Sequence, residues 1–310
     1  MRAVRLSPRA YERLTLIAVV AVAFIIIPGG AVRLTGSGLG CPDWPTCARG
    51  HVVAALSYHQ MVEFVNRVVT AVVSVVVILA VLGSMVRAPR RRDLTILSWG
   101  LVAGVVAQIV LGGVTVLAKL APPFVMAHFL LSMALLADAV VLHHRAAHPP
   151  GAARRIVDRD LVRLGRLLLA MTALTVVLGT VVTSSGPHGG DPKARRFDLS
   201  LHRVTQVHGT AAMLLVALVG GTIVLLRVNR APARVQRRAL LVLEALAAQV
   251  AVGYAQYFTG VPALLVGVHI AGAAALWVTV LQYHLALTER VPLDDVLPSI
   301  DARPPVLAET

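Results

Sequence analysis

The uncharged stretch from Ala245 to Thr288, ALAAQVAVGYAQYFTGVPALLVGVHIAGAAALWVTVLQYHLALT, decides the fold of this protein. A helix that crosses a bilayer needs about 20 predominantly apolar residues, and this stretch is long enough for two. The tripeptide Gly260-Val261-Pro262 interrupts it, and glycine close to proline is typical of a turn. The stretch therefore predicts two antiparallel membrane helices, near residues 239–259 and 263–286.

Uncharged apolar runs of similar size recur along the rest of the chain. They predict six further membrane helices, near residues 14–34, 61–86, 96–118, 124–143, 165–184 and 203–227. The composition agrees, because only 14% of the residues are charged and the mean hydropathy is +0.78, whereas a soluble domain has roughly 25% charged residues. We therefore expect an all-α integral membrane protein with eight transmembrane helices.

The charged residues indicate how these helices are oriented. The net charge of +14 alone would suit a nucleic-acid-binding protein, but nearly all charges lie in short segments between the apolar runs. A lipid membrane is thus the expected partner, and nucleic acid is not. Arginines cluster before the first predicted helix and after the second, fourth and sixth. By the positive-inside rule, both termini are predicted to be cytoplasmic.

Polar and small residues repeat at a nearly constant separation along the chain. The matched pairs are Gln108 with Gln249, Gly112 with Gly253, His128 with His269, Gly29 with Gly179, and Asn66 with His208. Four helices per repeat is an even number, so both repeats have the same topology. The duplication predicts two similar four-helix bundles, at residues 1–150 and 151–290. Residues 291–310, rich in proline and aspartate, are expected to form a disordered cytoplasmic tail.

Three histidines fall within the predicted helices at equivalent depth in the repeat: His128, His208 and His269. Ionisable side chains in a bilayer are costly and usually face the interior of a bundle. Two imidazoles on facing helices can ligate a haem iron, and His208 and His269 form such a pair. The first half has His128 opposite Asn66, a poor iron ligand, which predicts iron with an open face. The alternative is that these histidines make interhelical hydrogen bonds.

Glu63 lies three residues before Asn66 and four before Arg67, so the three residues share one face of a predicted helix. One interpretation is an intrahelical ion pair between Glu63 and Arg67 at the membrane interface. The other is a carboxylate directed into the first-half cavity, where it could move protons beside a reacting group. The spacing is compatible with both.

Cys41 and Cys47 lie in the connection after the first predicted helix, on the predicted outer side. A disulfide is chemically reasonable outside the cytoplasm, and the short gap between the two residues permits one. The spacing does not distinguish a structural bridge from a redox pair that passes electrons near a haem edge.

Several of these segments resemble the motifs of the haem A synthase family. The sequence GGAVRLTGSGLGCPDWPTC (29–47) resembles the family's first outer-loop signature, and EFVNR (63–67) and HFLLS (128–132) resemble its motifs in helices 2 and 4. The segments around His208 and His269 resemble its ligand positions in helices 6 and 8. The resemblance covers about residues 10–290. It implies an oxidoreductase that converts the C8 methyl group of haem O to the formyl group of haem A by two successive hydroxylations.

The resemblance also implies roles for residues of the second half and of the outer loop. His208 and His269 would ligate a haem b cofactor, and Cys41 and Cys47 would form the family's loop cysteine pair. For the first half it implies a substrate haem site that contains His128, as a further iron ligand, and Glu63.

Glu63 is the candidate catalytic residue of the first half, with Asn66 and Arg67 as its neighbours in the substrate site. The family commonly has histidine where this chain has Asn66. Capture of the substrate haem by two histidines is therefore not expected here.

The family resemblance implies partners and a location as well. Haem O would be the substrate, a membrane haem O synthase its supplier, and cytochrome oxidase assembly the use of the product. The protein would be a multi-pass protein of the bacterial plasma membrane. The resemblance is compatible with a monomer and with a homo-oligomer. Two other functions fit parts of the pattern: a bis-histidine cytochrome b that transfers electrons, and a transporter of haem or metal built on the parallel repeat.

Overall fold

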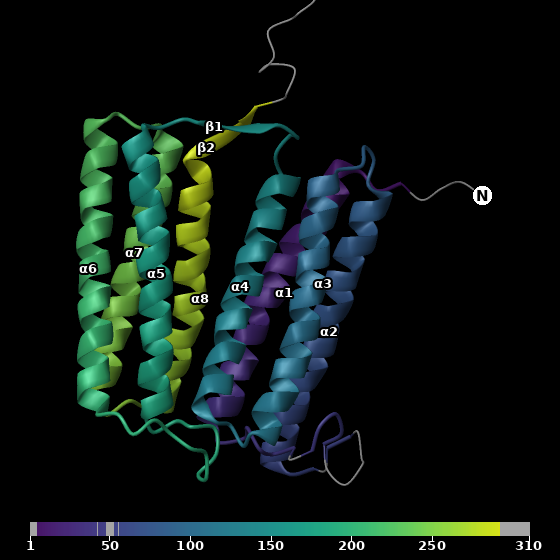
Figure 1. Ribbon diagram of the computed structural model, residues 1–310, viewed down its shortest axis with the longest axis vertical. Helices are drawn as coiled ribbons and strands as arrows, with labels where there is room; N and C mark the ends of the chain where they lie inside the picture. Colours follow the sequence, from purple (N-terminus) through teal and green to yellow (C-terminus); the bar gives the residue numbers. More distant parts are fainter. Residues whose placement is uncertain (1–4, 42, 48–52, 55, 292–310) are drawn as a thin grey trace, which may run out of the picture.

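The structure is a computed structural model that describes residues 5–41, 43–47, 53–54 and 56–291 (Figure 1). In this part of the chain it contains eight long apolar helices, each long enough to cross a membrane. They are α1 (Pro8–Leu34), α2 (Tyr58–Val86), α3 (Arg92–Leu117), α4 (Pro122–Ala146), α5 (Arg159–Ser185), α6 (Leu201–Val228), α7 (Ala233–Phe258) and α8 (Ala263–Ala286). The predicted fold class is confirmed.

Several helices begin earlier than the apolar runs predict, most clearly α1, α5 and α7. Their first turns carry arginines, which cannot be counted in an apolar run but are good helix formers. At α1 the start is determined by Ser7, whose Oγ accepts a hydrogen bond from the backbone N–H of Ala10 (3.2 Å). Pro8 follows in the first helical turn, where its missing N–H costs nothing.

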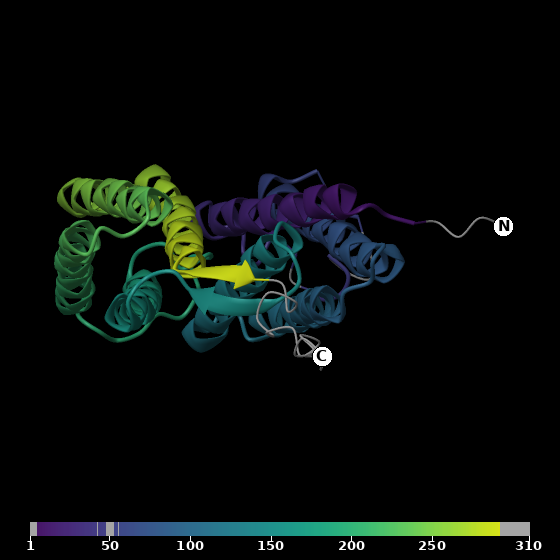
Figure 2. The ribbon, with the colours of Figure 1, turned by 90° about the horizontal axis from the view of Figure 1, so that it is seen from above.

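Helices α1–α4 and α5–α8 form two four-helix bundles that stand side by side (Figures 1 and 2). Within each bundle, helices that follow each other in sequence pack together, and the first helix packs against the fourth. The bundles meet where α8 contacts α1 and α4 and where α4 contacts α5. Trp277 of α8 crosses this seam and donates its indole N–H to the backbone carbonyl of Met133 in α4 (2.9 Å).

A two-stranded antiparallel ribbon joins the halves at one end of the bundles. Strand β1 (Ala152–Arg155) follows α4, and β2 (Thr288–Val291) follows α8; Ala152 is paired with Val291. The ribbon lies at the same end of the helices as the start of α1, while the loop after α1 lies at the opposite end (Figure 1). The predicted tail at 291–310 begins at the last residue of β2, and its remaining residues lie outside the described part.

The side of the membrane on which the ribbon lies is a prediction that labelling can test. We expect Leu199→Cys, in the connection between α5 and α6, to react in intact cells with a thiol reagent that does not cross membranes. Pro150→Cys, in the connection between α4 and α5, should react only in inverted vesicles. Both positions are exposed, and the native cysteines are buried in a disulfide, so they should stay silent. The opposite labelling pattern would reverse the predicted topology.

Candidate functional site

His208 of α6 and His269 of α8 face each other inside the second bundle. Their ring centres are 6.3 Å apart, and their planes are inclined by 80°. Nδ1 of His208 lies 3.1 Å from the backbone oxygen of Thr175 in α5. Because a carbonyl oxygen can only accept, this nitrogen carries the proton and Nε2 carries the lone pair. A carbonyl that orients a histidine in this way is typical of metal ligation.

The spacing of the two rings fits an iron atom held between them. A metal–imidazole bond is about 2 Å long, and the ring nitrogen lies about 1 Å from the ring centre, so two axial ligands have centres about 6 Å apart. Nδ1 of His269 is buried and has no hydrogen-bond partner in the described part of the chain. Buried polar atoms are normally satisfied, and the facing ring of His208 distinguishes this imidazole from a histidine packed in a core. The residues present therefore fit a bis-histidine haem.

Both rings pack against a glycine of the preceding helix. A Cβ placed on Gly179 of α5 would lie 3.1 Å from Cε1 of His208, and one placed on Gly253 of α7 would lie 3.5 Å from Cε1 of His269. The first distance is shorter than ordinary van der Waals contact. A side chain at Gly179 would thus displace the ring toward the centre of the bundle.

The first bundle repeats these contacts with one replacement. A Cβ on Gly112 of α3 would lie 3.3 Å from Cε1 of His128, and one on Gly29 of α1 would lie 3.9 Å from Oδ1 of Asn66. The matched residues of the sequence repeat thus occupy matched places in the two bundles. Asn66 stands where the second bundle has His208.

The interior of the first bundle contains polar atoms that the chain itself does not satisfy. Among the described residues, Oδ1 of Asn66 and Nδ1 of His128 are buried without a hydrogen-bond partner. Gln108 of α3 supports the helix turn of His128, because its Nε2 donates to the His128 carbonyl (3.1 Å) and to Oγ of Ser132. A fixed histidine and an unsatisfied amide facing one interior are expected of a ligand site.

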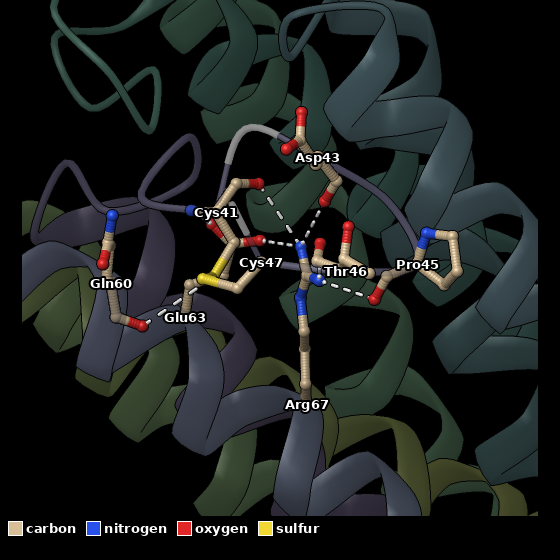
Figure 3. The surroundings of a disulfide bond; sticks show 8 residues. All are labelled: Cys41, Asp43, Pro45, Thr46, Cys47, Gln60, Glu63 and Arg67. Carbon is tan, nitrogen blue, oxygen red and sulfur yellow. Dashed lines mark hydrogen bonds and ion pairs between the residues drawn. A yellow bond between two sulfur atoms is a disulfide. The ribbon is translucent and has the colours of Figure 1, made fainter. Parts of the chain in front are cut away.

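Cys41 and Cys47 form a disulfide in the loop after α1, and two charged residues of α2 hold this loop (Figure 3). Glu63 is only 5% exposed. Its Oε1 accepts a hydrogen bond from Arg67 (2.7 Å), and its Oε2 accepts one from the backbone N–H of Cys41 (2.7 Å). Arg67 also donates to the backbone carbonyls of Cys41, Asp43, Pro45 and Thr46.

The ion-pair interpretation of Glu63 is thus present in the structure, and it does more than join two side chains of one helix. The pair fastens the disulfide loop to α2, at the end where the helix begins. Asn66 lies about one turn deeper on the same face. The loop is therefore held at the end of α2 that lies nearest to Asn66.

Polar contacts join the two halves, and the sequence did not predict them. Arg33, at the end of α1, donates to the backbone oxygens of His188 (2.8 Å) and Thr183 (2.9 Å) in the second half. The backbone N–H of Gly38 donates to the carbonyl of Gly190 (2.8 Å). An arginine at the end of an otherwise apolar helix indicates a polar contact. Its partners are backbone carbonyl groups, which no sequence pattern identifies.

Comparison with known proteins points to one family. A family model described as cytochrome oxidase assembly protein, COX15-CtaA, matches residues 12–61 and 50–281. Curated relatives include the haem A synthase of Bacillus licheniformis, which is 27% identical over 135 residues (43% of this chain and 44% of the relative). That of Exiguobacterium sibiricum is 28% identical over 164 residues (52% and 55%), and that of Shewanella oneidensis is 27% identical over 186 residues (54% and 53%). The chain thus spans about half the length of these relatives.

Proposed function

The chain belongs to the COX15-CtaA family of cytochrome oxidase assembly proteins, and from this premise we propose that it acts as a haem A synthase. It would oxidise the C8 methyl group of haem O to the formyl group of haem A in the bacterial plasma membrane. The observation that carries the proposal is that matched positions in the two bundles hold different side chains. Two histidines face each other in the second bundle, and one histidine with Asn66 takes their place in the first.

We propose the second half, residues 151–290, as the cofactor half. His208 and His269 would hold haem b through their imidazole rings. When bound, this haem supplies one-electron redox chemistry. The chain's contribution is positioning: Thr175 fixes the His208 ring through its backbone carbonyl, and Gly179 and Gly253 leave room for the two rings.

We propose the first half, residues 1–150, as the half that binds haem O. His128 would ligate the substrate iron, and Gln108 would keep its helix turn in place. The disulfide loop, fastened by Glu63 and Arg67, would close the outer end of the site and exclude water. Glu63 is also the proposed acceptor, at Oε2, of a proton released as the methyl group is oxidised.

The chemistry of the substrate also suggests where it comes from. Haem O carries a long apolar tail, so a membrane haem O synthase is the proposed supplier, and transfer would take place within the bilayer. Haem A is the proposed product, passed on to cytochrome oxidase assembly.

Extraction of the haems from the purified protein tests this proposal. Chromatography of the extract should give haem A or hydroxylated intermediates beside haem b, because substrate and cofactor occupy different halves. The competing function is a bis-histidine cytochrome b, which the facing pair of His208 and His269 would also serve. An extract with haem b alone would favour the cytochrome.

A further inference from the structure

We propose that the first bundle holds its haem through His128 alone and leaves the opposite axial position of the iron open to small external ligands such as carbon monoxide. This inference rests on the proposed function only in taking the first bundle as a haem site. It extends that function by stating what the iron of this site can bind.

The first step is the equivalence of Asn66 and His208. Both lie on the second helix of their bundle, and both face a glycine of the first helix, Gly29 and Gly179 respectively. Their partners across the bundle, His128 and His269, likewise each face a glycine. An iron held between two such positions therefore meets two imidazoles in the second bundle and one in the first.

The second step is the chemistry of the asparagine side chain. A neutral amide oxygen is a much weaker ligand for haem iron than an imidazole nitrogen. The amide has a different use at this position, because its NH₂ group can donate a hydrogen bond to a molecule bound on the open face. Oδ1 of Asn66 is buried without a hydrogen-bond partner in the described part of the chain, so the described groups of the protein do not hold its amide oxygen.

The third step concerns the neighbouring polar side chains, most of whose polar atoms are already engaged by the protein. Oε1 of Glu63 accepts a hydrogen bond from Arg67, and Oε2 accepts one from the backbone N–H of Cys41. Arg67 donates to the loop carbonyls, and Gln108 donates to α4. Oε1 of Gln108 is buried without a hydrogen-bond partner among the described residues, but an amide oxygen is a weak ligand for haem iron. None of these three side chains therefore replaces a second imidazole.

The repeat makes the two sites exchangeable by single substitutions. Asn66→His should close the first site by adding a second imidazole where the second bundle has His208. His208→Asn should open the second site and leave its iron on His269 alone. The double variant, Asn66→His with His208→Asn, should bind carbon monoxide in the second bundle and not in the first. Each single variant is therefore the matched control of the other.

The experiment is a carbon monoxide titration of the purified, dithionite-reduced protein after loading with haem b. Wild type should bind carbon monoxide at one class of haem and leave the low-spin bis-histidine class unchanged. Asn66→His should lower this binding at least about tenfold and convert the high-spin signal to low-spin. His208→Asn should add a second carbon monoxide site.

Further variants keep the result decisive. Asn66→Met offers a thioether ligand and should also reduce binding if Asn66→His fails to fold, whereas Asn66→Ala should keep the open position. The inference is overturned if the first bundle takes up no haem, if wild type binds no carbon monoxide, or if Asn66→His binds it as wild type does. Haem A content, measured on the same samples, reports separately on the proposed function.

Discussion

Replacement of His269 by alanine is expected to abolish the low-spin haem b absorption of the second bundle. His269 would supply one of two axial ligands, and its ring centre lies 6.3 Å from that of His208. Loss of a group that merely orients a metal ligand typically costs about 10–100-fold in metal affinity, so loss of the ligand itself should cost more. His208→Ala should have the same effect. Absorption spectra and haem content per mole of protein are the measurements.

A matched control lies on the same helix. His284 also has a buried Nδ1 without a partner among the described residues, but it stands near the other end of α8, beside Gly165. His284→Ala should therefore keep the low-spin spectrum. Retention of the full bis-histidine spectrum in both His208→Ala and His269→Ala would remove the cofactor assignment.

Replacement of Glu63 by glutamine is expected to lower haem A formation by about 10²–10⁴-fold, the usual range for loss of general acid–base assistance. Glutamine has nearly the same shape, and its amide oxygen can still accept the hydrogen bond from the backbone N–H of Cys41. Haem b content should stay near normal, because the second bundle is not touched. Haem A produced per mole of haem b is the quantity to measure.

The structural role of Glu63 in holding the disulfide loop needs its own control, since Glu63 also pairs with Arg67. Arg67→Lys keeps the charge but loses the planar fork that reaches several carbonyls. It should lower thermal stability more than activity per folded molecule. If Glu63→Gln behaves in the same way, with haem A per folded molecule near that of wild type, Glu63 holds the loop and has no part in proton transfer.

The helices and the repeat could be predicted because their signals are local or periodic. The uncharged runs predict the eight spans closely, and the break at Val261 separates α7 from α8 as expected. Matched histidines and glycines predict which positions are equivalent, and Gly112 and Gly253 lie against His128 and His269 in the same way. The polar first turns of α1, α5 and α7 were missed because arginine interrupts an apolar run without ending a helix.

Contacts with backbone groups could not be predicted. Arg33 joins the two halves through the carbonyls of His188 and Thr183, and Arg67 holds the disulfide loop through carbonyls as well. Every residue carries such a carbonyl, so the sequence does not single out the partner. The ribbon of β1 and β2 was missed for a related reason: each strand is only 4 residues long, too short for an alternating pattern.

The central claim is that this chain converts haem O to haem A, and the most direct test is haem extraction from cells that make haem O but no haem A of their own. With the wild-type chain present, chromatography and mass spectrometry of the extracts should show haem A at the expense of haem O. Cells with His128→Ala should retain haem O. Unchanged haem O beside a wild-type protein that is folded and carries a low-spin bis-histidine haem would contradict the account.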